Sequence, residues 1–579
     1  MRGYTPAFYA RARQLLFTLR RGEAPGPALA LALSLALNGA LELMGIYGFS
    51  YDAYTHIFFA DHYRRAWFSL WEPRWYGGFS VASYPPLSHQ LLALLSFPLG
   101  LIPAYQLLAT ASAGLLTYSS YLFSRLFLGR QEGGWAALAA ALLPSVGLTL
   151  NAFGQLPTIL SSSLVLLAAY RLGAYLRGGG ARPLLQAVLL LTLSGLAHHF
   201  TLLFFAPSAL LLILIRFGGD LRRALREAAL FMLLCAPLLL ASLYPFISYM
   251  LSAPSWAEIP HASREQLFSS ARASLPFFWG IYGFTALLLP NALALAYRKR
   301  ELRALFALFL LYFLLGLGGT TPLPQLLFGP LWKLLTYDRF GFWATLLYAP
   351  FLGIMLKDGP TFVREYYLGL KGGGGSAGAP LRAAFIFGLA LCFLLSSTGL
   401  ALFGVAPTGP LNEQQLAQLA SFLDQQGDYG YITLGLGNGR LLLSALTSAP
   451  TLDGGYNLAK SSPLLAKSGV ESADAAKFFP NGYAFLSQLL ANASRLGLRF
   501  VISADPSYDG LLRDAGFRLR GELMGAPPVS IWEIPEVAPL SSPSPAASAQ
   551  GLLWGLVPPL LLVLLLGLLL HGPKARPAP

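Results

Sequence analysis

Long apolar runs, separated by short polar or basic segments, dominate the pattern along the chain. A run of about 20 mostly apolar residues matches a helix that crosses the apolar core of a bilayer. The runs that fit are roughly 26–46, 103–124, 134–152, 156–175, 184–200, 202–216, 228–247, 274–296, 303–318, 341–356, 383–404 and 551–570. The pattern therefore predicts an all-α polytopic membrane bundle of about twelve transmembrane helices.

One further apolar segment, 86–102, is short and is broken up by prolines. Basic residues gather in the cytoplasmic loops of membrane proteins, and this rule decides whether the segment crosses. If it does not cross, most of the basic loops share one side with the N-terminal arginines and with Lys574 and Arg576. We therefore expect a surface or re-entrant helix at 86–102 and cytoplasmic termini, in a bacterial or archaeal cell membrane.

The composition supports this class of protein. Of the 579 residues, 55% are hydrophobic and only 11% are charged, which is too few charges for a soluble surface or a disordered chain. The net charge of +14 is explained by topology-setting loops, so we expect no nucleic-acid partner. Cys235 and Cys392 lie in apolar runs, which excludes a disulfide framework.

The pattern changes after the transmembrane domain, 1–404. Region 405–550 is more polar, with strand-like runs at 430–434, 499–503 and 529–534 between helical stretches such as 412–423 and 483–493. This alternation predicts a small extracytoplasmic α/β domain. The last segment, 551–579, adds a final transmembrane helix and a basic cytoplasmic tail.

The first outer loop, 47–102, holds the most polar and aromatic stretch near the membrane. Asp52 and His56 are four residues apart, so they share a face if the segment is helical. A carboxylate there suits a general base, and His and Arg suit an anionic phosphate. Secondary candidates follow in the same loop: Asp61, His62, Arg64 and Arg65.

Further ionisable residues are expected at the outer ends of later spans, where they are costly unless they face a cavity. They are His198, His199, Asp338 and Arg339. We expect these four to converge with Asp52 and His56 on one outward cavity. A divalent metal held by Asp52, His56 and His198 is possible by ligand type, but the spacing does not specify it.

Each candidate also has a purely structural interpretation. Asp52 is a possible helix cap, and His198 with His199 are possible interfacial residues. Asp338 and Arg339 fit an ion pair. Arg64 and Arg65 suit lipid headgroups, and Asp61 with His62 suit a solvated helix face.

Several catalytic motifs are absent from the sequence. It contains no Walker A loop, no HExxH and no GxSxG. The glycine-rich stretch GLGNGR, 435–440, would lie outside the cell, where nucleotide is scarce, so we interpret it as a turn.

The first outer loop resembles a known superfamily. Asp52 and His56 are followed by W-x-P-R-W-x-x-G, 71–78, and by Tyr84-Pro-Pro-Leu. This set resembles the GT-C superfamily of integral-membrane glycosyltransferases. More narrowly, it is similar to bacterial and archaeal membrane proteins labelled "6-pyruvoyl-tetrahydropterin synthase-related", although no pterin-enzyme zinc site is present. The likeness is best over about 45–200 and looser to about 404.

The resemblance implies transfer of a sugar from a polyprenyl-phosphate carrier to an unknown glycan, lipid or protein acceptor at the outer face. Asp52 would be the catalytic base, with His56 beside it. The implied substrate- and phosphate-binding residues are Arg74, Tyr84, His198, His199, Asp338 and Arg339. The second outer loop, LNAFGQLP, has no carboxylate, a departure that counts against a metal mechanism.

Two other classes of function stay open at this point. A flippase or transporter for lipid-linked glycans predicts ionisable residues near the bilayer midplane, where the spans are almost free of charge. A non-catalytic assembly protein would use region 405–550 to bind partners.

Overall fold

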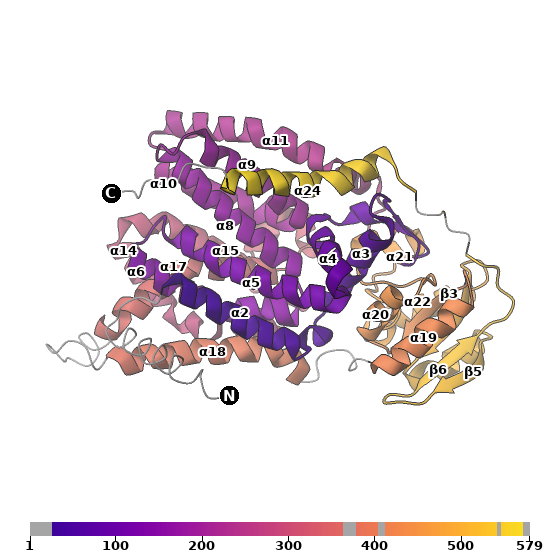
Figure 1. The fold of residues 1–579 in the computed structure, drawn as a ribbon. Coiled ribbons are helices and arrows are strands. Elements are labelled where there is room, and N and C mark those ends of the chain that lie inside the picture. Colours follow the sequence, from indigo (N-terminus) through magenta and orange to yellow (C-terminus); the bar gives the residue numbers. More distant parts are fainter. Residues whose placement is uncertain (1–25, 363–377, 403–410, 541–542, 544–545, 571–579) are drawn as a thin grey trace, which may run out of the picture.

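The computed structural model describes residues 26–362, 378–402, 411–540, 543 and 546–570. A bundle of helices occupies one part of the molecule, and an α/β unit made by 411–540 lies at one end of it (Figure 1). The N-terminal arginines and the basic tail, which carried the topology prediction, lie outside the described residues.

Each predicted span coincides with a helix or with a run of adjacent helices. The helices of the bundle are α2 (Pro27–Leu43), α3 (Ala53–Ala66), α4 (Leu87–Leu99), α5 (Leu101–Ser124), α6 (Arg130–Ala141), α7 (Pro144–Gly147), α8 (Leu156–Leu176), α9 (Ala181–Ala197), α10 (Ala206–Phe217), α11 (Leu221–Ser252), α12 (Ala271–Ser274), α13 (Gly280–Tyr282), α14 (Leu289–Arg298), α15 (Arg303–Gly316), α16 (Leu323–Phe328), α17 (Asp338–Phe362), α18 (Gly378–Leu402) and α24 (Ala549–Leu570).

Length and composition qualify six of the described helices as membrane spans. A seventh qualifies if Arg130–Ala141 and Pro144–Ala152, which meet at 41°, form one bent span. Several other helices of the bundle are apolar but have only 10 to 17 residues. The protein is therefore a multi-pass membrane protein, and the number of about twelve crossings stays a prediction.

Segment 86–102 contains a short helix, as expected. Helix α4 has 13 residues, about 20 Å at 1.5 Å per residue, which is less than the apolar thickness of a bilayer. Gly100, with φ of 84°, reverses the chain into α5. His89 and Leu92 on α4 are buried, whereas Leu94 and Phe97 are exposed, so one face of the helix packs on the protein.

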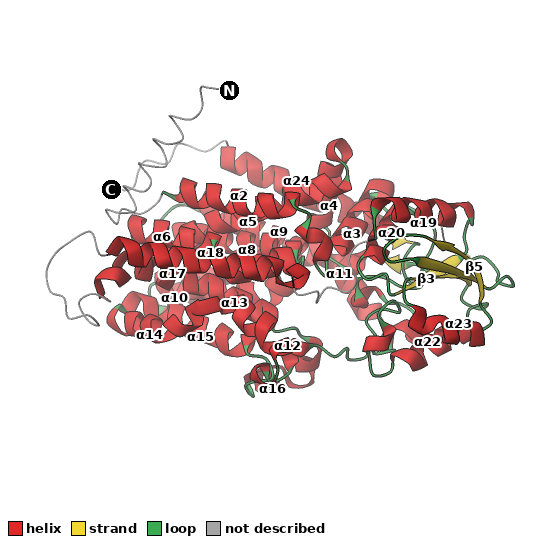
Figure 2. Cartoon of the chain, turned by 90° about the horizontal axis from the view of Figure 1, so that it is seen from below, coloured by secondary structure: helices red, strands yellow, loops and turns green. Residues whose placement is uncertain are grey.

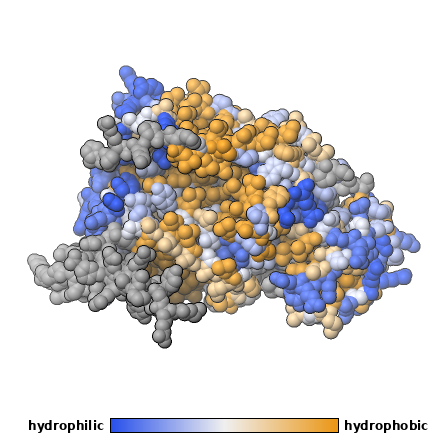
Figure 3. Space-filling model, viewed as in Figure 1, coloured by the Kyte–Doolittle hydropathy of each residue, from blue (hydrophilic) through white to orange (hydrophobic). Residues whose placement is uncertain are grey.

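Figure 3 shows hydrophobic residues covering the middle of the bundle and hydrophilic residues gathered over the α/β unit. The exposed side chains of α11 and α24 are mostly leucines, among them Leu233, Leu240, Leu560 and Leu564. An exposed apolar band of this kind is expected where the solvent is lipid.

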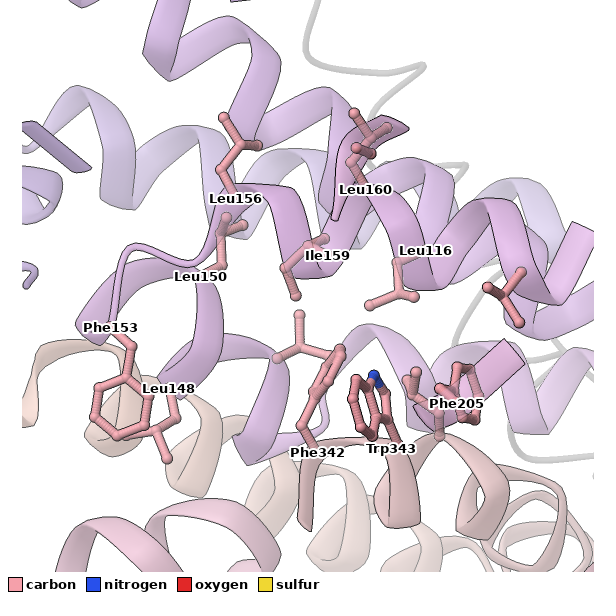
Figure 4. Close-up of a cluster of buried hydrophobic side chains, with 14 of the residues drawn as sticks. Leu116, Leu148, Leu150, Phe153, Leu156, Ile159, Leu160, Phe205, Phe342 and Trp343 are labelled. Carbon is pink, nitrogen blue, oxygen red and sulfur yellow. The ribbon is translucent and has the colours of Figure 1, made fainter. Parts of the chain in front are cut away.

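The interior of the bundle is packed with large apolar side chains. Figure 4 shows Ile159 of α8 facing Phe342 of α17, with Trp343 beside it on the same helix. Phe205 stacks on Trp343 with ring centroids 5.6 Å apart. This packing fixes α8 and α17 relative to each other, and the polar residues at their N-terminal ends become part of the site.

The α/β unit contains a four-stranded sheet in the order β3-β4-β6-β5. The strands are β3 (Gly430–Leu434), β4 (Leu498–Ser503), β5 (Arg518–Leu523) and β6 (Val529–Glu533). Strands β3 and β4 are parallel, and the other two pairs are antiparallel. The three strand-like runs found in the sequence are thus confirmed, and β5 was missed because only Leu519 and Leu523 in it are strongly apolar.

Helices cover both faces of this sheet. Figure 2 shows α19 (Glu413–Gln425) and α20 (Gly439–Leu446) on one side, and α22 (Gly482–Ala491) and α23 (Asp509–Asp514) on the other. The shorter α21 (Pro463–Ala466) lies in the long crossover between β3 and β4.

The α/β unit is docked on the first outer loop. Trp75 Nε1 donates to Ser444 Oγ over 2.8 Å, and the backbone N–H of Thr451 donates to the Arg74 carbonyl over 2.6 Å. Asn438 Nδ2 donates to the Ser50 carbonyl over 2.5 Å. The first outer loop and the α/β unit therefore lie at the same end of the bundle.

Candidate functional site

Asp52 occupies the N-cap position of α3, but its carboxylate does not cap the helix. An aspartate at this position ordinarily accepts a hydrogen bond from a backbone N–H of the first turn. Here Ser50 Oγ lies 3.3 Å from the backbone nitrogen of Ala53 and accepts its hydrogen bond instead. The interpretation of Asp52 as a helix cap is wrong, and its half-buried carboxylate is left for other chemistry.

The second outer loop holds the backbone on either side of this carboxylate. The N–H groups of Tyr51 and Asp52 donate to the carbonyls of Ala152 and Phe153, over 3.2 and 3.1 Å. Gly154, with φ of +70°, lies against them, and a Cβ there would stand 2.6 Å from Ala53 N and 2.7 Å from Ser50 Oγ. The loop LNAFGQLP thus contributes backbone and glycine to the site rather than a carboxylate.

Gly154→Ala is expected to lower turnover about 10- to 100-fold, because its Cβ must push the Asp52 backbone out of position. The matched control is Gly178→Ala. Gly178 has a similarly left-handed φ of +93° with nothing within 4 Å of its Cβ position, so it tests strain without displacement. Turnover of both variants, with their unfolding midpoints, measures the effect. Equal losses in the two variants would mean that backbone strain alone is responsible.

Tyr84 lies at the centre of a group of aromatic and imidazole rings. Its ring centroid is 5.8 Å from that of His56, 5.0 Å from His89, 6.2 Å from His198 and 6.0 Å from His199. His56 Nδ1 lies 3.0 Å from His89 Nε2. The structure thus brings His56, Tyr84, His198 and His199 together, and His56 pairs with His89.

The α/β unit adds a residue that the sequence did not single out. The Tyr456 ring lies 4.8 Å from that of Tyr84, and its backbone exchanges hydrogen bonds with the Tyr76 hydroxyl. Nothing in the local sequence marks Tyr456, because it reaches the site only through the docking of a distant segment.

Asp338 and Arg339, at the start of α17, do not form an ion pair with each other. Asp338 Oδ2 accepts a hydrogen bond from Gln155 Nε2 over 3.1 Å, and the guanidinium of Arg339 donates to Thr336 Oγ1 over 2.6 Å and lies over the Phe200 ring. Asp338 Oδ1 and Arg339 Nε are buried, and neither has a hydrogen-bond partner among the described residues. One polar atom of each residue is therefore left without a protein partner among the described residues, as expected of a residue that binds a ligand.

The charges around Asp52 tune its acidity. Burial raises the pKa of the Asp52 carboxyl to about 7, an effect that the positive charge of Arg339 opposes and the negative charges of Glu471 and Asp338 reinforce. A pKa near neutrality suits a general base. Burial, aided by Arg339, lowers the pKa of His56 to about 3, so His56 is neutral and does not serve as a cation.

Arg74 and two of the secondary candidates, Asp61 and His62, form a separate, buried network with Glu72. Arg74 is 3% exposed, and its guanidinium nitrogens lie 2.7 Å from Asp61 and 2.8 Å from both Glu72 oxygens. His62 bonds Glu72 and the Ser69 carbonyl. Burial alone would raise the pKa of Glu72, but Arg74 and His62 outweigh it and hold that pKa well below its usual range.

This network binds the first outer loop to the α/β unit. Arg65 bonds Asp61, Ser448 and the Ala445 carbonyl, whereas Arg64 lies farther out, 3.9 Å from Asp61. Asp61 and His62 are 4% and 1% exposed, so their interpretation as a solvated face is wrong. Arg74, predicted as a phosphate ligand, has its guanidinium taken up by Glu72 and Asp61 and is not brought to Asp52.

The glycine-rich stretch GLGNGR joins β3 to α20, an arrangement that elsewhere binds phosphate. Here the carboxylate of Asp474 accepts the backbone N–H groups of Leu436 and Gly437, over 2.9 and 2.7 Å. The anion-binding position is therefore occupied by the protein itself, and Asn438 of the same turn bonds the Ser50 carbonyl.

Asp52, His56 and His198, the possible donors to a divalent metal, do not form a ligand set in the described part of the chain. No group of three or more His, Cys, Asp or Glu residues suited to a metal ion occurs in the described part of the chain. His56 pairs with His89, and His198 Nδ1 lies 2.8 Å from Thr201 Oγ1.

Solved structures share this architecture. The chain superposes on ArnT from Cupriavidus metallidurans bound to undecaprenyl phosphate with a TM-score of 0.53 and 12% identity, over 89% of this chain and 99% of that chain. For the oligosaccharyltransferase of Archaeoglobus fulgidus in its apo form, the TM-score is 0.50 at 14% identity, over 84% and 71%. No protein-family model and no curated protein matches the sequence. The fold expected from the resemblance to the GT-C superfamily is thus confirmed, and membership of the superfamily and of the narrower group stays a prediction.

Proposed function

We propose that this protein is a membrane glycosyltransferase that moves a sugar from a polyprenyl-phosphate carrier to a hydroxyl of a glycan, lipid or protein acceptor. The observation that carries the proposal is the Asp52 carboxylate, which makes no capping hydrogen bond and lies within the electrostatic influence of Arg339. It lies in a fold shared with a protein that was crystallised with undecaprenyl phosphate. Transfer would take place at the outer face, on the side of the α/β unit.

In the proposed reaction the acceptor oxygen attacks the anomeric carbon of the sugar. Asp52 accepts the proton of that hydroxyl as the new carbon–oxygen bond forms. The bond between the anomeric carbon and the carrier phosphate breaks, and the phosphate leaves with the bonding electrons. Arg339 stabilises this charge by charge-assisted hydrogen bonds.

The uncharged groups of the site position the substrates. His56 is neutral and fixed by His89, so it can orient a hydroxyl without attracting a second anion. Tyr84 and Tyr456 present adjacent rings, which suits the apolar face of a sugar. His198, His199 and Asp338 complete the candidate substrate-binding residues.

Turnover is expected to rise with pH and to be half-maximal near pH 7, because a carboxylate whose pKa is raised to about 7 is protonated, and inactive as a base, below that value. Arg339 lowers the pKa of Asp52, so in Arg339→Met the midpoint moves to higher pH. Initial rates between pH 5 and 9 measure both. A midpoint near pH 4 would mean that the essential base is an ordinary, solvated carboxylate.

Binding of the carrier tests the proposal apart from turnover. Undecaprenyl phosphate is expected to raise the unfolding midpoint of the protein in lipid, because a ligand that binds only the folded state stabilises it. Undecaprenol, which has the same chain and no phosphate, is the matched ligand and should stabilise less. Equal stabilisation by both would contradict a phosphate-binding site.

A further inference from the structure

Helix α24 carries two consecutive prolines, Pro558 and Pro559, in its interior. Proline has no backbone N–H, so the carbonyl four residues before it loses its donor within the helix. The two carbonyls affected are those of Trp554 and Gly555. In an apolar bilayer such carbonyls need other partners.

Both carbonyls accept hydrogen bonds from the first outer loop. Gln90 Nε2, on α4, donates to the Trp554 carbonyl over 2.9 Å. Trp67 Nε1, directly after α3, donates to the Gly555 carbonyl over 3.0 Å. The indole N–H of Trp554 donates in turn to the Tyr63 hydroxyl over 3.0 Å. The groups freed by the two prolines are thus paired with α3 and α4.

Two glycines allow this close approach. A Cβ at Gly551 would stand 2.0 Å from the Phe68 carbonyl oxygen, and one at Gly555 would stand 2.6 Å from the Phe68 ring. Gly551 and Gly555 are one turn apart, a spacing that lets a membrane helix pack closely on a neighbour. In Figure 1, α24 runs beside α9 and α11, and its N-terminal part carries the two bonds to Gln90 and Trp67.

We propose that α24 is a positioning element for the active site and not only an anchor for the α/β unit. Pro558 and Pro559 leave two carbonyls of α24 without a helical partner, and these carbonyls bind Gln90 and Trp67. Because Gln90 lies on α4 and Trp67 directly follows α3, the two bonds fix the helices that carry His89 and His56. Gln90 and Trp67 are therefore positioning residues. This role rests on the proposed transferase function, whereas the contacts themselves do not.

A double-mutant cycle between Gln90→Met and Pro558→Ala tests the proposal in the full-length protein. Methionine keeps the length of glutamine and removes the donor, and alanine restores the N–H that competes for the Trp554 carbonyl. Gln90→Met alone is expected to lower kcat about tenfold, with the KM for the carrier unchanged. In the Pro558→Ala background the same change is expected to have less than about a twofold further effect.

The matched control is Gln186→Met, which removes a similar bond at the other end of α24. Gln186 Nε2 donates to the Leu568 carbonyl over 3.1 Å, far along the helix from Trp554, and this variant is expected to keep full turnover. A loss as large in Gln186→Met as in Gln90→Met would overturn the positioning role.

Unfolding midpoints of the four proteins in the cycle separate the contact from the reaction. Non-additive midpoints for positions 90 and 558 support the contact between Gln90 and α24, whether or not the protein turns over any donor. If the midpoints are coupled but no donor is turned over, the proposed function is wrong and the contact stands. Additive changes in both midpoint and turnover overturn the inference.

Discussion

Replacing Asp52 with asparagine is expected to lower turnover about 100-fold or more, with the unfolding midpoint unchanged. Asparagine has the size of aspartate but cannot accept the proton of the acceptor hydroxyl. Because Ser50 and not Asp52 caps α3, the substitution removes no helix cap. Rates and unfolding midpoints of the purified proteins in lipid measure the two effects separately.

The matched control is another aspartate at a helix N-cap. Asp220 does cap its helix, α11, with its carboxylate accepting the Arg223 N–H over 2.8 Å. Asparagine caps helices as well as aspartate does, so Asp220→Asn is expected to keep full activity. Full turnover in Asp52→Asn would refute its role as the base, and a fall in both turnover and unfolding midpoint would make its role structural.

Arg339→Met is expected to lower kcat about 100-fold, because it removes the cation placed to stabilise the departing phosphate. Arg339→Lys should recover part of the loss, since lysine restores the charge without the planar fork that binds two phosphate oxygens. Initial rates over a range of carrier concentrations give kcat and KM for each variant.

Lys333→Met controls for the loss of a nearby positive charge. Lys333 precedes α17 by one short segment, its side chain is 53% exposed, and it pairs with the exposed Glu258. An exposed ion pair of this kind contributes little, so turnover should change less than about twofold. If Arg339→Met were as active as Lys333→Met, the phosphate would have to be bound elsewhere.

Hydropathy and charge predicted much of the fold, because each signal is carried by residues close together in the chain. The apolar runs coincide with helices, and the proline-interrupted segment 86–102 contains the 13-residue α4. The alternating runs of region 405–550 became β3, β4 and β6. The composition of Arg518–Leu523 did not mark β5, which pairs along one side with β6.

The sequence named candidate residues for the site but did not predict which of them contact each other. Ionisable residues at the outer ends of apolar runs are costly unless they face a cavity, and this reasoning grouped Asp52, His198 and Arg339 as candidates, a grouping that stays a prediction. It did not predict that His56 pairs with His89, because the two lie on different helices that meet only in the folded chain.

Arg74 shows where spacing alone misleads. In the sequence it is a basic residue in a polar, aromatic loop, which suits a phosphate ligand. In the structure Glu72 and Asp61 surround it, and Thr451 of the α/β unit bonds its backbone carbonyl. A contact between residues so far apart in the chain leaves no signal in one sequence.

The most direct test of the account is release of the free carrier. Wild-type protein and Asp52→Asn, each in lipid, would be given a panel of polyprenyl-phosphate sugars, each with candidate acceptors from a cell envelope, and polyprenyl phosphate would be followed by mass spectrometry. The account predicts release from at least one donor by the wild type and about 100-fold less by the variant. Binding of the carriers without release from any donor would contradict it and favour transport or assembly.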